Sequence, residues 1–105
     1  MRIKTGITMT ALALAIALPG AAAAPDGAAL YKKTCTTCHG ADGAGQTPMG
    51  KKMKLRDLRS VEVRKQTDIE LMKIISGGKE KMPAYGKKMT TDEIQAVIAF
   101  IRTLK

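Results

Sequence analysis

The segment Cys35-Thr36-Thr37-Cys38-His39 combines residue types and a spacing that suit covalent attachment of a haem. Two thiols three positions apart can each add to a vinyl group of one porphyrin. The histidine that follows is then held beneath the ring, where its imidazole can reach the iron. This Cys-x-x-Cys-His pattern is typical of c-type haem attachment. We therefore predict one covalently bound haem c, with thioether bonds at Cys35 and Cys38 and an axial bond from His39.

Three other uses of the two cysteines explain the sequence less well. A zinc site would stop at three Cys and His ligands, because the chain has two cysteines and one histidine. A disulfide across two intervening residues would close a very small loop, stabilise the chain little and leave His39 unexplained. A dithiol oxidoreductase motif belongs near a βαβ pattern, which the sequence lacks.

The second axial position of the iron has several candidate ligands. No second histidine exists, so a methionine thioether is the best remaining protein ligand. Met82 lies in a stretch expected to join two helices, and Pro83 restricts it to an extended conformation that can direct its side chain inward. Met53 and Met89 are the alternatives. Met72 falls near an apolar helix stripe and is expected to pack in the core.

The N-terminus has the organisation of a secretory signal. Arg2 and Lys4 precede an apolar stretch over residues 7–18, and Pro19-Gly20 leads into four alanines. We predict cleavage after Ala23, which removes residues 1–23 and leaves a single domain over residues 24–105 in the periplasm; cleavage after Ala22 or Ala24 is an alternative. An uncleaved membrane anchor is less favoured, because the apolar stretch is shorter than the roughly 20 residues of a spanning helix.

Composition limits the remaining possibilities. The predicted domain is small and holds only three aromatic residues, Tyr31, Tyr85 and Phe100, so it can bury little core without a staple or a cofactor. A bound haem would supply the missing apolar bulk.

The net charge of +9 is concentrated in lysine clusters at residues 51–54, 79–81 and 87–88. An exported chain with so few aromatics to stack on bases is a poor nucleic-acid binder. The clusters predict docking of acidic redox proteins or of an anionic membrane surface, and the alternative is a solvated basic surface. We expect a monomer, no nucleic-acid partner and no stable membrane insertion after cleavage.

Three helices are predicted from caps and periodicity, with no strand-like alternation. The first spans residues 26–34 with Asp26 as N-cap. The second and third begin at capping boxes, Thr67 with Glu70 and Thr90 with Glu93. The second ends at residues 77–78, and its expected apolar positions are Ile69, Met72 or Leu71, Ile74 and Ile75. The third carries an apolar stripe at Ile94, Val97, Ile98, Ile101 and Leu104.

A short fourth element is possible at residues 60–65, and the glycine-rich stretch between His39 and Met53 is expected to be a loop. The sequence therefore predicts an all-α domain of three or four short helices around one haem. Its first and last helices should pack together, because neither can bury its apolar face alone.

These features resemble the small class I c-type cytochromes of bacteria. The resemblance covers residues 25–105 and includes the segment from Tyr31 to Gly40, the small residue Gly27, the loop from Gly78 to Tyr85 and the final helix with Phe100. It implies His39 and Met82 as axial ligands, haem contacts from Tyr31, Tyr85 and Phe100, and a Pro48 carbonyl that accepts the Nδ1–H bond of His39. The tryptophan that binds a haem propionate in mitochondrial relatives is missing.

The expected function is soluble periplasmic transport of single electrons, with no enzymatic activity. One alternative is a small haem c subunit of a larger oxidoreductase complex. A peroxidase-like or gas-binding protein with an open sixth site is less favoured, because no spare histidine could serve as its acid–base group.

Overall fold

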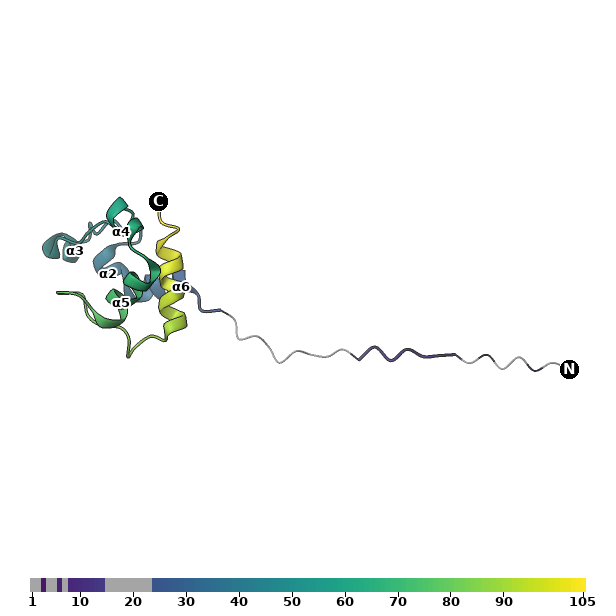
Figure 1. The fold of residues 1–105 in the computed structure, drawn as a ribbon. Helices are drawn as coiled ribbons and strands as arrows, with labels where there is room; N and C mark the ends of the chain where they lie inside the picture. The colour runs from purple at the N-terminus through teal and green to yellow at the C-terminus, as the bar shows by residue number, and fades with distance from the viewer. Residues whose placement is uncertain (1–2, 4–5, 7, 15–23) are drawn as a thin grey trace.

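The computed structural model describes residues 3, 6, 8–14 and 24–105 and shows a helical domain that ends in the long helix α6 (Figure 1). Within the described ranges the regular elements are six helices and one isolated β-bridge between Lys79 and Met82. The helices are α1 (Gly27–Thr34), α2 (Thr36–His39), α3 (Pro48–Met53), α4 (Val61–Lys65), α5 (Asp68–Gly77) and α6 (Thr91–Ile101). The all-α prediction is confirmed. Most of the predicted signal peptide lies outside the described residues.

Helices α1 and α6 pack closely against each other, as the sequence predicts. A Cβ atom at Gly27 would overlap the backbone carbonyl of Ala96, so only glycine allows this approach. Beside the crossing, the rings of Tyr31 and Phe100 pack with their centroids 5.1 Å apart. The crossing thus fixes the position of α1, which leads directly into the cysteine segment.

The predicted capping boxes are present at both long helices. Thr67 Oγ1 accepts a hydrogen bond from the Glu70 N–H, and Glu70 Oε2 accepts one from the Thr67 N–H, at 3.1 and 3.0 Å. Thr90 and Glu93 make the same pair of bonds at the start of α6. Helix α5 ends at Gly78, whose φ of +76° is in the region that favours glycine.

The apolar face of α5 differs from the prediction. Ile69 is 69% exposed, and Leu71 and Ile75 are the buried positions of the helix. Ile69 lies in the first turn of the helix and is exposed. Of the two alternatives predicted for this face, Leu71 is the buried residue. Met72 is half-buried and packs against the same core.

The prediction of an unbroken loop between His39 and Met53 is wrong at its second half, where α3 forms. Thr47 caps this helix by accepting a hydrogen bond from the Gly50 N–H at 2.9 Å, and Pro48 occupies the first helical position, which suits proline. Helix α4 confirms the weak turn expected at residues 60–65, with Ser60 as its cap.

The core consists of buried side chains from α1, α4, α5 and α6, together with Met89, which precedes α6. Its buried members are Tyr31, Val63, Leu71, Ile75, Met89, Ile94, Val97, Ile98 and Ile101. No helix among the described residues is long and apolar enough to cross a membrane.

Candidate haem site

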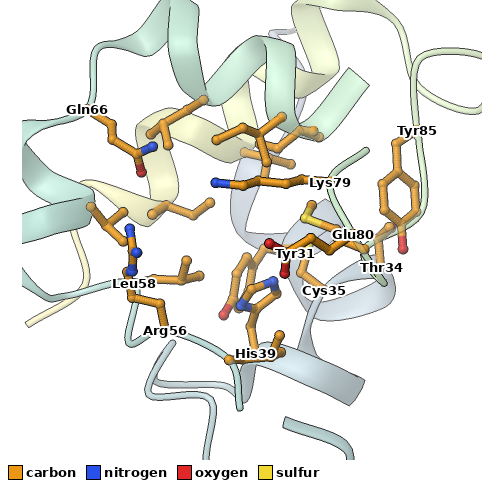
Figure 2. Close-up of a pocket in the computed structure, with 18 of the residues that line it drawn as sticks. Tyr31, Thr34, Cys35, His39, Arg56, Leu58, Gln66, Lys79, Glu80 and Tyr85 are labelled. Carbon is orange, nitrogen blue, oxygen red and sulfur yellow. The ribbon is translucent and has the colours of Figure 1, made fainter. Parts of the chain in front are cut away.

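A cavity of about 270 Å³ opens on the inner side of the core, next to the cysteine segment. Figure 2 shows the His39 ring directed into this cavity, with Cys35 and Tyr31 beside it and the Lys79 side chain extended across the opposite side. A smaller cavity of about 50 Å³, which shares Cys35 and His39 with the larger one, is also lined by Cys38, so the two cysteines and the histidine meet at this smaller cavity. In a domain with so small a core, a void of this size needs an apolar occupant.

Both thiols are free and half-buried, and the surroundings of Cys35 disfavour its thiolate. Burial, with a smaller contribution from the neighbouring Cys38, raises the pKa of Cys35 to about 11. A dithiol oxidoreductase needs the opposite, a thiol pKa lowered toward neutrality. The two cysteines therefore fit covalent attachment better than dithiol exchange.

His39 is held in the form that binds iron. Burial lowers the pKa of its imidazole below the usual value, so the ring is neutral at pH 7 and has a lone pair available for a metal. Its Nδ1 atom is buried and has no hydrogen-bond partner within the part of the chain that the structure describes. Among these described residues, no protein acceptor therefore orients the ring through Nδ1.

Three methionines line the larger cavity: Met53, Met82 and Met89. Met82 and Met53 also line the smaller one, whereas Met89 is 8% exposed and belongs to the buried core. Met72 does not line either cavity and packs against the core, in keeping with its predicted role. Met82 and Met53 are thus the methionines whose side chains share both cavities with His39.

The Met82 loop is pinned by a tight turn. Lys79 and Met82 exchange two backbone hydrogen bonds, at 2.9 and 3.1 Å, which leaves Glu80 and Lys81 at the tip. Glu80 has a φ of +54°, an uncommon conformation for a residue with a Cβ. The loop then returns to α5, because the Tyr85 N–H donates to the Ile75 carbonyl at 2.9 Å.

Tyr31 and Tyr85, for which haem contacts are predicted, both line the larger cavity, and Tyr31 makes a bond that the sequence did not reveal. Its hydroxyl donates to the Gly40 carbonyl at 2.6 Å. Burial raises the pKa of Tyr31 to about 12, so this hydroxyl keeps its proton over the physiological range. Tyr85 lines both cavities, and its pKa is also raised by burial.

One predicted contact is not found. Pro48 is exposed at the start of α3, and His39 Nδ1 has no hydrogen-bond partner among the described residues, so the Pro48 carbonyl does not accept from it. Phe100 packs on Tyr31 and lines neither cavity, and its haem contact stays a prediction.

Other residues of the cavity wall were not predicted to line the site, although some were expected on apolar helix faces. They come from the 54–66 segment, the inner faces of α5 and α6, and the Met82 loop, and include Leu55, Arg56, Leu58, Val63, Gln66, Leu71, Ile75, Glu80, Val97 and Ile101. The apolar stripe on α6 could have suggested Val97 and Ile101. No local pattern marks Leu55, Arg56 or Leu58, because they reach the site through the path of a loop.

The family model for cytochrome c oxidase, cbb3-type, subunit III matches residues 22–101. The chain belongs to the class I c-type cytochromes. It is accordingly a small electron-transfer protein that carries a covalently bound haem c. The cavity, the paired thiols and the His39 ring directed into the cavity fit this group.

Individual relatives support the same assignment. The cytochrome is 30% identical over 79 residues to cytochrome c6 of Gloeothece citriformis, covering 74% of this chain and 68% of that protein. It is 31% identical over 82 residues to the cbb3-type cytochrome c oxidase subunit FixP of Azorhizobium caulinodans; this match covers 78% of the chain but only 27% of FixP. The chain thus spans about a quarter of that larger relative.

A solved structure shows that the fold is shared as well. The c-type cytochrome KustC0563 superposes with a TM-score of 0.70 at 32% sequence identity, over 76% of this chain and 98% of that one.

Proposed function

We propose that this cytochrome is an exported, soluble carrier of single electrons, with Cys35 and Cys38 bonded to the haem and His39 and Met82 as axial ligands. The observation that carries the proposal is that all four side chains line the smaller cavity, and that Cys35, His39 and Met82 also line the larger one. When bound, the haem supplies an iron that accepts and releases one electron between Fe(III) and Fe(II). Export rests on the signal-like sequence of residues 1–23.

The protein's own residues would do three things. His39 and Met82 would occupy both axial positions and exclude other ligands, and a thioether in place of a second imidazole favours the reduced state. Leu71, Ile75 and Val97 would keep water from the buried face, which also favours the less charged ferrous form.

The basic rim of the site would guide partners. Lys54, Arg56 and Lys79 line the larger cavity, and Lys81 lines the smaller one. Their only acidic neighbour among the lining residues is Glu80. This excess of positive charge favours acidic redox proteins that dock briefly over the site.

An absorption spectrum taken with and without carbon monoxide tests the ligation. We expect the reduced protein to be low-spin and unchanged by carbon monoxide, because a filled sixth position leaves no site for it. A carbon monoxide complex in the parent protein would contradict the proposal and favour a gas-binding or peroxidase-like role.

Variants identify the sixth ligand. Met82→Ala should open the site and allow carbon monoxide to bind, whereas Met53→Leu and Met89→Leu should keep the parental spectrum. If Met53→Leu alone opened the site, Met53 would be the ligand in place of Met82.

A second candidate is a subunit of a membrane oxidase, since the family model that matches and one relative are of that type. Such a subunit should present a sizeable apolar face to its complex. Within residues 24–105, the large apolar side chains that are exposed are Met49, Val61 and Ile69, one on each of three helices. Release of the haem protein in the soluble periplasmic fraction supports the carrier, and retention with an oxidase in the membrane fraction supports the subunit.

A further inference from the structure

The end of α2 is tied down by an unusual set of hydrogen bonds. The last carbonyls of a helix have no partner within it, and α2 ends at His39. Three successive carbonyls each accept a bond from a different segment. The Cys38 carbonyl accepts from Thr47 Oγ1 at 2.7 Å, the His39 carbonyl from the Gly45 N–H at 2.8 Å, and the Gly40 carbonyl from the Tyr31 hydroxyl at 2.6 Å. We call these three bonds the carbonyl clamp.

Thr47 serves the clamp and α3 at the same time. Its hydroxyl donates to the Cys38 carbonyl and accepts from the Gly50 N–H. Gly50 is buried, and a Cβ atom there would overlap the carbonyls of Cys38 and Gly45. Helix α3 therefore packs directly on the end of α2, and the local helix that the sequence did not predict exists because it completes this contact.

Tyr31 provides the third hydrogen bond of the clamp, from α1. It lies on α1, is 1% exposed, and is held by the ring of Phe100. Its hydroxyl is one of the few polar groups in the core and is fully used by the Gly40 carbonyl. A phenylalanine would pack equally well there, so the hydroxyl points to a role beyond packing.

We propose that Thr47 and Tyr31 are positioning residues that hold the His39 imidazole and set the reduction potential of the haem through the carbonyl clamp. The proposal rests on His39 being an axial ligand. Its basis is that Nδ1 of His39 has no partner to orient the ring, whereas the backbone on both sides of His39 is bonded. The clamp fixes the backbone of residues 38–40, from which the His39 imidazole projects.

The sign of the effect follows from charge. A carbonyl oxygen carries partial negative charge, and a hydroxyl that donates to it offsets part of that charge. Removing the donor leaves the oxygen near His39 more negative, which stabilises the more positive ferric state. Loss of either hydroxyl should therefore lower the reduction potential.

The test uses the haem-loaded protein and two variants, Tyr31→Phe and Thr47→Val. The midpoint potential is measured by spectroelectrochemical titration, and the haem methyl proton shifts of the ferric protein report the orientation of the axial imidazole. We expect both variants to have a lower potential and an altered spread of methyl shifts, while their spectra stay low-spin. Thr47→Ser keeps the hydroxyl and should restore the parental values.

Two control variants separate this role from general stability. Thr36 Oγ1 donates to the Lys32 carbonyl at 2.6 Å, a bond of the same kind at the other end of α2, so Thr36→Val should keep the parental potential. Thr67→Val removes a helix cap remote from the clamp and should also keep it.

The outcomes are distinct. If Tyr31→Phe and Thr47→Val melt at lower temperature but retain the parental potential and methyl shifts, the clamp is structural only and the inference is wrong. If Thr47→Val does not fold, Tyr31→Phe decides alone, since it removes one hydroxyl and keeps the ring. A parent protein without low-spin haem would instead overturn the ligation proposed above.

Discussion

At the scale of single residues, burial favours the uncharged forms of side chains in the site. His39 is neutral because burial penalises its charged form, and the Cys35 thiol is kept protonated for the same reason. Glu80 is one of two residues with a Cβ that take a positive φ among the described residues, the other being Lys54, and it lies at the tip of the Met82 turn. Glycine adopts this conformation without steric cost, so the turn stores strain close to a predicted ligand.

Glu80→Gly should stabilise the protein. We expect an increase of roughly 0.5–1 kcal/mol in the free energy of unfolding, because the relief of left-handed strain exceeds the greater entropy of glycine in the unfolded chain. Chemical denaturation of the haem-loaded protein measures it. Glu80→Gln is the matched control, since it removes the same charge but keeps the Cβ. An equal gain in both variants would assign the effect to charge.

At the scale of the elements, short helices are held by caps and by one close crossing. Each capping box satisfies two backbone N–H groups at a helix start. Arg102 adds a long-range tie, since its guanidinium donates to the Gln66 carbonyl and to Asp68 Oδ1 and so links the end of α6 to the start of α5. The helices are too short to be stable alone, so these contacts determine the architecture.

Removing a cap should have a measurable cost. Thr90→Ala should lower the free energy of unfolding by about 1 kcal/mol, because the Glu93 N–H loses its acceptor at the start of α6. The control is Thr91→Ala, one residue later, which is exposed and inside the helix, where alanine is favoured. Equal destabilisation by the two substitutions would contradict the capping role.

The crossing of α1 and α6 should tolerate no side chain at Gly27. Gly27→Ala should cost about 2–3 kcal/mol, because its Cβ meets the Ala96 carbonyl, and a helix backbone cannot move aside without separating the core. Gly77→Ala is the matched control, as open space surrounds its position in α5. Thermal unfolding compares the two, and a Gly27→Ala protein as stable as the parent would show that the helices can separate slightly at no cost.

At the scale of the whole molecule, charge is distributed unevenly around the site. The cavity rim has lysines and one arginine, whereas acidic groups such as Glu70 and Glu93 are used in helix caps. A mostly positive rim raises the rate at which negatively charged partners encounter the site, and salt screens this attraction.

Electron transfer to an acidic redox protein should therefore slow as ionic strength rises. Stopped-flow kinetics measure this rate, and a neutral small-molecule reductant, which no charge steers, serves as the control. At low salt, Lys79→Gln should lower the rate several-fold. Lys73→Gln makes the same charge change on α5 outside the cavity lining and should have a smaller effect. A rate with the acidic partner that is independent of salt would reject steering.

The amino-acid sequence by itself was enough to predict the features that depend on neighbours within a few positions. The spacing of Cys35, Cys38 and His39, the caps at Thr67 and Thr90, and the stripe on α6 are local patterns, and an all-α haem protein follows from them. Even the close crossing at Gly27 could be predicted, because the family resemblance identifies Gly27 as the small residue at which the first and last helices pack together.

The tertiary structure alone decided which segments close around the cavity. Thr47 caps an unexpected helix because its hydroxyl meets the distant Cys38 carbonyl. Pro48 is turned outward by that helix, and Leu55, Arg56 and Leu58 become part of the cavity wall. These outcomes could not be predicted from local pattern, because each depends on contacts between residues far apart in the chain, whose free energies exceed local preference.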